Sequence, residues 1–185
     1  MRMLAGQRII VVGLGTIGRE VARLLHAVGC EVEGVQRRAT GRVPGVTRLW
    51  LLADLSTALS GADGVVLTLP DAPGTAGVVN ARALAALPPH AVVVNVGRGT
   101  VVDEGALAAA LVGGRLRGAA LDVTAHEPLP ATSMLWQLPQ VLLSPHTAAL
   151  TMHEDEQLLN LFVDNLARYL DGRPLRNLVG FQRSG

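Results

Sequence analysis

Four polar residues that could do chemistry each lie where a predicted strand has just ended. Arg98 follows one short apolar run, Asp122 ends the next, Glu127 lies in the loop after Asp122, and His146 follows the last run. Because ligands of an open parallel sheet bind beyond the carboxyl ends of its strands, we expect these side chains to gather at one edge. An arginine can grip a carboxylate through two hydrogen bonds, and a histidine can exchange a proton near neutral pH. The set therefore suits the reversible oxidation of a 2-hydroxy acid.

Each side chain has its own part in that chemistry. Arg98 would hold the substrate carboxylate, His146 would take the hydroxyl proton as hydride leaves, and Glu127 would fix the orientation of the imidazole. Each residue also has an ordinary alternative. Arg98 could be a solvated loop arginine, Glu127 a plain loop carboxylate, and His146 a hydrogen-bonded histidine at a strand end. His126 is a rival to His146 because it stands next to Glu127, but it matches no motif.

A glycine-rich turn near the start of the chain predicts a dinucleotide site. The apolar run Arg8–Val12 has the composition of a buried strand, and Gly-Leu-Gly-Thr-Ile-Gly follows it directly as residues 13–18. Residues 19–28 then have apolar side chains at helical spacing, namely Val21, Leu24, Leu25 and Val28. Between a strand and a helix, such a turn places backbone amides against a diphosphate. The alternative is a strand-to-helix turn that binds nothing.

The rest of the chain alternates between predicted strands and helices. Strands are expected at residues 31–35, 47–49, 64–69, 91–95, 118–123 and 141–144, and helices at residues 54–60, 80–86 and 103–112, with a loop at residues 39–45. Asn80 and Asp103 are predicted N-caps. This alternation predicts an α/β fold with one doubly wound parallel sheet. We expect residues 1–150 to form the dinucleotide-binding domain. Residues 151–185 would form a C-terminal helix and tail, with Leu158, Leu159, Phe162, Val163, Leu166 and Leu170 on one helix face.

Composition narrows the classes of function. Hydrophobic residues make up 49% of the chain, and the formal net charge of +1 favours no nucleic-acid partner. No apolar run is long enough for a membrane span and no basic leader opens the sequence, so a cytoplasmic location without membrane contact is expected. The single Cys30 is interpreted as buried filler in a reducing compartment. The five histidines are scattered, and no metal site is predicted.

Four motifs resemble the D-isomer-specific 2-hydroxyacid dehydrogenase family. They are residues 13–18, Asn95-Val96-Gly97-Arg98-Gly99-Thr100-Val101-Val102-Asp103, Leu121-Asp122-Val123 with Glu127-Pro128-Leu129-Pro130, and Ser144-Pro145-His146-Thr147-Ala148. Their order and spacing match the family, and the resemblance covers nearly all of the chain. It implies a Rossmann fold and an NAD(P)-dependent oxidoreductase of the glyoxylate/hydroxypyruvate-reductase type. It also implies that Arg98 is the substrate-binding arginine and that Glu127 and His146 are the acid/base pair.

The same resemblance, together with the glycine turn, defines a set of predicted cofactor contacts. Asp122 would contact the nicotinamide end, and Pro70 and Thr75 would lie near the cofactor. The complete predicted set is Gly13, Gly15, Thr16, Ile17, Gly18, Gln36, Arg37, Arg38, Leu69, Pro70, Thr75, Val96, Gly97, Arg98, Asp122 and His146.

The end of the second predicted strand bears on the choice between NAD and NADP. A site selective for NAD usually presents an acidic residue about 20 residues beyond the glycine turn, where it binds the ribose 2′-hydroxyl. Here Gln36 occupies the strand end, and Arg37 and Arg38 follow it. Two guanidinium groups could pair with a 2′-phosphate, which favours NADP. The alternative is that both arginines are solvated and NAD binds.

The resemblance also implies a second, substrate-binding domain, of which residues 151–185 would be a remnant and the N-terminal part would be missing from this chain. Family members build much of the substrate pocket from an N-terminal segment, whereas this chain begins almost at the first strand of the sheet. A segment on the order of 100 residues, the size of a small domain, is therefore expected to be missing. Two hypotheses remain open: an oxidoreductase acting on a small 2-oxo or 2-hydroxy acid, as a fragment or completed by another chain, and a non-catalytic dinucleotide-binding module. A homodimer is a further expectation.

Overall fold

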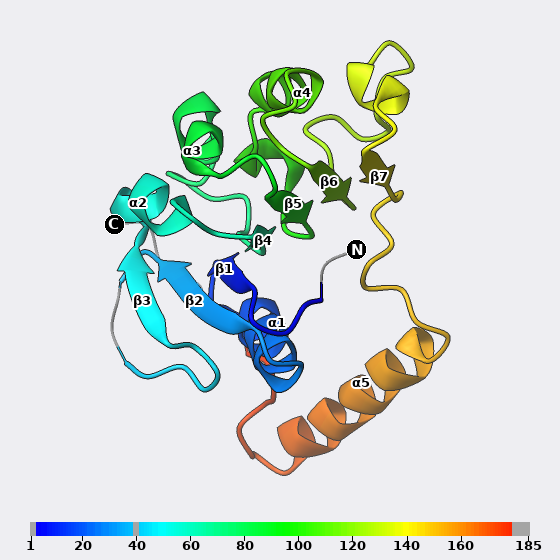
Figure 1. Cartoon of the computed structure of the whole chain (residues 1–185). Coiled ribbons are helices and arrows are strands. Elements are labelled where there is room, and N and C mark those ends of the chain that lie inside the picture. The colour runs from blue at the N-terminus through cyan, green and yellow to red at the C-terminus, as the bar shows by residue number, and fades with distance from the viewer. Residues whose placement is uncertain (1–2, 39–40, 179–185) are drawn as a thin grey trace. The chain divides into compact units, whose positions relative to one another are not determined.

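Seven parallel strands form one sheet in the order β3-β2-β1-β4-β5-β6-β7 (Figure 1). The computed structural model describes residues 3–38 and 41–178. The strands are β1 (Arg8–Val12), β2 (Glu31–Gln36), β3 (Arg48–Leu51), β4 (Gly64–Leu67), β5 (Val92–Asn95), β6 (Gly118–Leu121) and β7 (Val141–Leu143). From β1 the chain first builds outward to β2 and β3, and then returns to place β4 on the other side of β1. The direction of strand order therefore reverses between β1 and β4, where ligands of such sheets bind.

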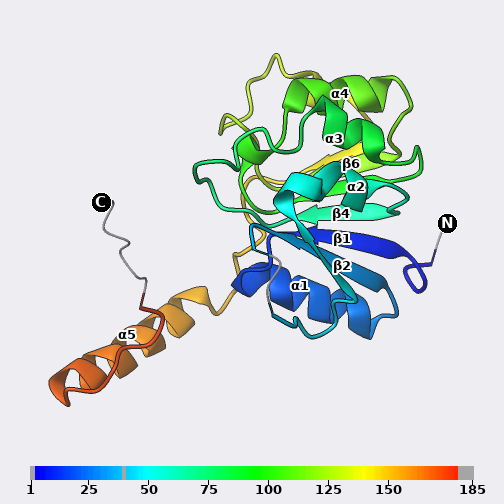
Figure 2. The same ribbon diagram turned by 90° about the vertical axis from the view of Figure 1, so that its left-hand side faces the viewer.

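The helices cover the two faces unequally. The helix α1 (Thr16–Ala27) lies on one face, and α2 (Leu55–Leu59), α3 (Ala81–Ala86) and α4 (Glu104–Val112) lie side by side on the other (Figure 2). Both predicted N-caps are confirmed. The side chain of Asn80 accepts hydrogen bonds from the amides of Arg82 and Ala83, and that of Asp103 accepts one from the amide of Ala106. Each cap satisfies helix amides that have no partner within the helix.

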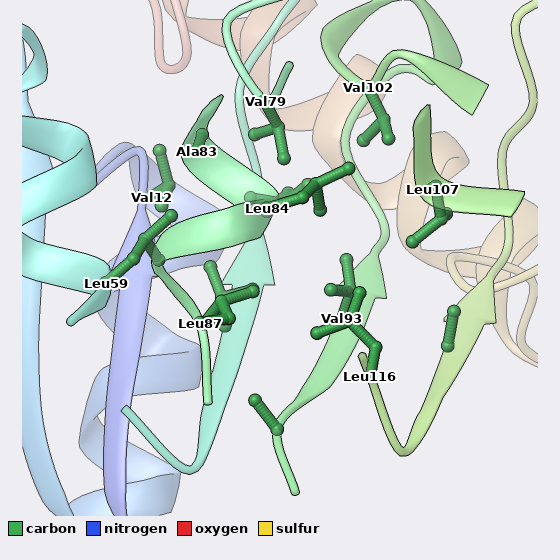
Figure 3. Packing of buried hydrophobic residues seen from close by; sticks show 14 of the residues in the cluster. Val12, Leu59, Val79, Ala83, Leu84, Leu87, Val93, Val102, Leu107 and Leu116 are labelled. Carbon is green, nitrogen blue, oxygen red and sulfur yellow. The ribbon is translucent and has the colours of Figure 1, made fainter. Parts of the chain in front are cut away.

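The main core lies between the sheet and α2, α3 and α4. Val12, Leu84 and Val93 are among its buried side chains, and Figure 3 shows residues from strands and helices packed together there. A smaller cluster under α1 contains Ile9, Val11 and Cys30. Burying apolar surface at about 25 cal/mol per Å² is the main force that holds the helices on the sheet. As predicted, Cys30 is buried filler, and burial raises the pKa of its thiol.

Some predicted boundaries and one predicted face are wrong. The strands β4 and β6 end at Leu67 and Leu121, each two residues earlier than predicted, because their ladder partners β1 and β5 end in register with them at Val12 and Asn95. The helix α1 begins three residues earlier than predicted, within the glycine turn. Leu24 and Val28 are exposed by about half, because Gly18 and Ala22 form the buried side of α1.

A partly buried ion pair ties β1 to β2 and β3. Arg8 donates through Nε and Nη2 to the two carboxylate oxygens of Glu33, at 2.8 and 2.9 Å. Trp50 also donates its indole N–H to Glu33, and the Arg48 guanidinium lies 3.6 Å from the Trp50 ring centre. Burial raises the pKa of Glu33, but the bonds from Arg8 and Trp50 outweigh it, so the pKa lies below its ordinary value. The pair joins β1, which precedes the glycine turn, to β2, which ends at Gln36.

The chain divides into two compact units, Met1–Ala148 and Ala149–Gly185. The second unit contains α5 (Glu154–Leu170), which ends at Asp171 and Gly172, and a tail that folds back through a hydrogen bond from the Arg176 amide to Asn165 at 2.8 Å. No residue of α5 is buried, so residues 149–178 leave its apolar face uncovered. Part of the predicted loop, Ala39 and Thr40, and the end of the predicted tail, residues 179–185, lie outside the described residues. Within the described ranges, no helix has the length and apolar character that crossing a membrane requires.

Candidate dinucleotide and acid–base site

The turn between β1 and α1 is shaped by two glycines. Gly13 adopts φ +98°, a conformation that disfavours other residues, and its amide bonds to the carbonyl of Val35 at 2.8 Å. A Cβ built on Gly18 would stand 1.8 Å from the carbonyl oxygen of Gly13, so only glycine fits there. Thr68, after β4, donates its hydroxyl to the Gly13 oxygen at 2.6 Å. The turn is thus pinned between its two neighbouring strands.

The first turn of α1 is open to an anion. Gly15 is its N-cap and has no side chain to bond the helix amides, and the first turn has no acidic residue. Gly15, Thr16 and Ile17 are exposed, and a Cβ on Gly15 would meet nothing within 4 Å. Unpaired amides together with the helix dipole favour a negatively charged group at this position. The residues therefore fit a diphosphate, which would come close to the backbone at Gly15.

The strand order reverses between β1 and β4. The loop after β4 therefore lies opposite the glycine turn that follows β1. Leu69 is buried and Pro70 is exposed. Thr75 is also buried, and its hydroxyl lies 2.8 Å from the Pro70 carbonyl oxygen and accepts a bond from the Ala72 amide. Thr75 was predicted to lie near the cofactor, and its hydroxyl bonds within its own loop. These bonds hold the turn that contains Pro70.

The Arg98 loop is held tightly on both sides. A Cβ on Gly97 would lie 2.6 Å from the Leu69 carbonyl oxygen, and one on Gly99 would lie 1.9 Å from the backbone of Thr124. Asn95 is almost fully buried, and its amide group accepts from the Gly97 amide and donates to the Arg98 carbonyl. Sequence reasoning quoted Asn95 only as part of a motif and missed this bracing role. Arg98 itself is exposed.

His146 and Glu127 form a hydrogen-bonded pair at the carboxyl edge of the sheet. The imidazole Nδ1 lies 2.8 Å from Glu127 Oε2, and the two side chains are 49% and 40% exposed. The bond from His146 lowers the pKa of Glu127, with help from the Thr124 amide and from the charge of Arg98. Glu127 therefore stays ionised and can orient the ring, which leaves Nε2 for another partner. The pair lines an open pocket of about 660 Å³ with Leu129, Trp136 and Pro145 among its walls.

The rival histidine does not form this pair. The backbone carbonyl of His126 accepts a hydrogen bond from the Thr124 hydroxyl at 2.9 Å, whereas the partner of Glu127 is His146. Asp122 is buried at the end of β6 and accepts hydrogen bonds from the loop that contains His146. Ser144, which sequence reasoning quoted only within a motif, donates its hydroxyl to Asp122. The structure thus brings Asp122, Glu127 and His146 together, and the charge of Arg98 reaches Glu127.

The strand β2 ends at Gln36, where the sequence predicted a strand end. Gln36 is the last residue of β2 and pairs with Leu51, and Arg37 and Arg38 follow it as exposed residues. Because Gly13 bonds to Val35, the end of β2 lies directly beside the glycine turn. Among residues 3–38 and 41–178, no three His, Cys, Asp or Glu side chains group as metal ligands would.

The fold and the glycine turn define a Rossmann-type dinucleotide-binding domain. Residues 1–148 match the family model described as D-isomer specific 2-hydroxyacid dehydrogenase, NAD binding domain. The chain therefore belongs to the D-isomer-specific 2-hydroxyacid dehydrogenase family. The predicted family, the predicted fold and the prediction of NAD or NADP as cofactor are confirmed.

Individual relatives are similar across nearly the whole chain. Glyoxylate/hydroxypyruvate reductase A of Klebsiella pneumoniae (strain 342) is 36% identical over 94% of this chain and 54% of that protein. A D-isomer specific 2-hydroxyacid dehydrogenase from Xanthobacter autotrophicus Py2, solved with NADPH and MES, superimposes with a TM-score of 0.85 at 39% identity, over 97% of this chain and 73% of that one. An NADPH-dependent glyoxylate/hydroxypyruvate reductase from Sinorhizobium meliloti, solved with NADP and sulfate, superimposes with a TM-score of 0.87 at 33% identity. The match covers 97% of this chain and 57% of that one. The chain thus spans about half the length of the curated relatives it matches.

Proposed function

We propose that this chain binds NADP(H) and provides the proton-transfer pair for reduction of a small 2-oxo acid to its D-2-hydroxy acid. The observation that carries the proposal is the 2.8 Å bond between His146 and Glu127 at the sheet edge where the glycine turn opens. A nicotinamide held at this site would supply the hydride in reduction and accept it in oxidation. His146 gives a proton to the substrate oxygen during reduction and takes it back in the reverse direction. Glu127 holds the ring and stabilises its protonated form.

Arg98 has the role of holding the substrate carboxylate. It follows Gly97 in a loop braced by Asn95, so its backbone is fixed while its side chain is exposed. Its guanidinium donates through Nη1 to the Gly97 carbonyl at 2.7 Å and has further N–H groups with which to bind a ligand. A guanidinium can form two parallel bonds with a carboxylate, which sets the orientation of the carbonyl beside it. The substrate class follows from this grip: a small acid with the carbonyl next to the carboxylate. The glyoxylate/hydroxypyruvate reductases among the relatives support the same class.

Preference for NADP(H) rests on the end of β2. No carboxylate stands at Gln36 to repel a 2′-phosphate, and Arg37 and Arg38 supply two exposed positive charges beside the diphosphate turn. The relatives solved with NADPH or NADP support this choice. We assign Gly13, Gly15, Thr16, Ile17 and Gly18 to the diphosphate, and Leu69, Pro70, Val96, Gly97 and Asp122 to the nicotinamide half.

A second candidate function is dinucleotide binding without turnover. His146 is half-exposed, and a site open to water weakens the electrostatic stabilisation of a transition state. If the chain is instead the oxidoreductase, a complementing chain or a second copy completes the pocket. Residues 1–150 then form the dinucleotide domain, and residues 151–185 reach toward the completing part.

The test is to follow NADPH and NADH absorbance with glyoxylate, hydroxypyruvate or pyruvate. Turnover by the wild-type chain that is lost in His146→Gln supports the oxidoreductase. Saturable binding of NADPH with no turnover on any of the three acids supports the binding module. Turnover that is unchanged in His146→Gln contradicts the assigned proton transfer.

A further inference from the structure

The loop after β7 holds His146 in an unusual backbone conformation. His146 has φ +55°, in the left-handed region that residues other than glycine seldom adopt. Such a conformation persists only when the surrounding structure holds it. The imidazole at this position is the one that bonds to Glu127. Whatever holds the loop therefore also sets the geometry of the acid–base pair.

Asp122 provides most of the bonds that hold this loop. Its backbone carbonyl accepts from the His146 amide at 2.8 Å. Its carboxylate accepts from the Thr147 amide at 2.9 Å, from the Ala148 amide at 3.0 Å and from the Ser144 hydroxyl. The bonded residues lie on both sides of His146 in the sequence. The buried side chain of Asp122 thus holds the loop on both sides of His146.

The charge of Asp122 agrees with this arrangement. Burial raises the pKa of a carboxyl group, but here the Ser144 hydroxyl, the two amides and the charge of His146 outweigh burial and leave the pKa of Asp122 below its ordinary value. The carboxylate is therefore ionised at neutral pH and acts only as an acceptor. Bonds from amides to an ionised group are stronger than those to a neutral one.

We infer that Asp122 is a positioning residue: its carboxylate, with the Ser144 hydroxyl, keeps the His146 backbone in its left-handed conformation and thereby keeps the imidazole on Glu127. The resemblance implied a contact between Asp122 and the nicotinamide, whereas this role operates without any cofactor. Its importance for proton transfer rests on the proposed function, but its effect on geometry does not.

The pKa of the Glu127 carboxyl group reports whether His146 keeps its position. Glu127 faces His146, the Thr124 amide and the charge of Arg98, and the His146 bond contributes most to its lowered pKa. If the loop relaxes, the imidazole leaves Glu127 and the pKa of Glu127 rises. In Asp122→Asn an amide N–H₂ replaces one acceptor oxygen and faces a backbone N–H, so at least one bond to the loop is lost. Ser144→Ala removes one bond and leaves the carboxylate intact.

The experiment is a carbon-13 NMR titration of the glutamate carboxyls in the whole chain without cofactor, with the Glu127 signal assigned from Glu127→Gln. Asp122→Asn is expected to raise the Glu127 pKa by roughly half a unit or more, and Ser144→Ala by less. The matched control is Asp103→Asn, which makes the same change at the α4 cap, where Asp103 accepts from the Ala106 amide, and should leave Glu127 unchanged.

Two outcomes would overturn the inference. One is a folded Asp122→Asn protein in which Glu127 titrates as in the wild type. The other is an equal shift in Asp103→Asn, which would indicate general loosening. If Asp122→Asn does not fold, Ser144→Ala decides by the same criterion. Because the titration needs no turnover, a chain without activity but with the expected shift would refute the proposed reaction and leave the positioning role of Asp122 standing.

Discussion

Gly18 lies directly against the backbone of Gly13. A Cβ on Gly18 would stand 1.8 Å from the Gly13 carbonyl oxygen and 2.7 Å from the Thr68 hydroxyl, whereas a Cβ on Gly15 would meet nothing within 4 Å. Gly18 is therefore required by the protein's own packing. Gly15 leaves room on the side where the helix amides are open. Two residues of one turn thus have separable purposes.

This difference predicts opposite outcomes for two alanine variants. Gly18→Ala should lower the melting temperature, because backbone atoms cannot move aside cheaply. Gly15→Ala should keep the wild-type melting temperature but weaken NADPH binding by about tenfold or more, since its methyl group occupies the approach of the diphosphate. Thermal unfolding and calorimetric titration measure the two effects. If Gly15→Ala bound NADPH as the wild type does, the diphosphate would not lie at this turn.

The two arginines after β2 predict cofactor preference. Replacing Arg37 and Arg38 together by serine should weaken NADPH binding by roughly ten- to a hundredfold and leave NADH binding nearly unchanged, because only NADPH has the 2′-phosphate. The difference should shrink at high salt. Arg42→Ser, in the following loop, is the control and should alter neither affinity. An equal loss for both cofactors would show that the arginines do not recognise the 2′-phosphate.

Proton transfer by His146 predicts a change confined to turnover. His146→Gln should lower kcat by about 10²- to 10⁴-fold, the usual contribution of a positioned acid or base, while the Kd for NADPH stays the same. His90→Gln is a matched control, since His90 also pairs with a carboxylate, Asp63, at 3.0 Å. Steady-state kinetics and a binding titration of the same preparations give both quantities. Wild-type kcat in His146→Gln would exclude it as the proton donor.

Arg98 should act on substrate orientation more than on the cofactor. Arg98→Lys keeps the charge but loses the planar fork that binds a carboxylate through two bonds. We expect KM for the 2-oxo acid to rise and kcat to fall, with Glu127 and His146 still paired. Kinetics against glyoxylate, with NADPH saturating, measure both constants. An unchanged KM would place the substrate carboxylate elsewhere.

The Arg8–Glu33 pair predicts a loss of stability in acid. The pKa of Glu33 is lower in the folded chain than in the unfolded one, so its contribution is present above the unfolded pKa and is lost as pH falls below about 4 toward the folded value. Glu33→Gln should lower the free energy of unfolding at neutral pH by on the order of 2 kcal/mol and flatten its pH dependence. Glu20→Gln, in an exposed pair with Arg23, should change neither. Urea unfolding at several pH values tests this; parallel curves for wild type and Glu33→Gln would refute it.

Sequence patterns predicted the fold well because local signals agreed with one another. Short β-branched runs, the glycine turn and the capping residues Asn80 and Asp103 each specify one kind of element without long-range help. Leu24 and Val28 misled the prediction because helical spacing identifies an apolar face but not which side the sheet will cover. There the small residues Gly18 and Ala22 allow α1 to approach the sheet closely.

Some contacts among the candidate site residues could be expected from the sequence, and others could not. Spacing along the chain indicates which strand end each residue follows, and so the pairing of His146 with Glu127 could be expected. The bonds from Asp122 to the His146 loop join residues 25 and 26 positions apart, and no local pattern contains them. The hydroxyl of Thr75, which the family resemblance placed near the cofactor, is also bound within its own loop, and no local pattern predicted those bonds.

The most direct measurement is a calorimetric titration of the purified chain with NADPH and with NADH, beside Gly15→Ala. We predict saturable one-site binding of both, tighter for NADPH, and weakened in the variant. A folded chain that binds neither dinucleotide at millimolar concentration would contradict the assignment of the turn between β1 and α1 as a dinucleotide site.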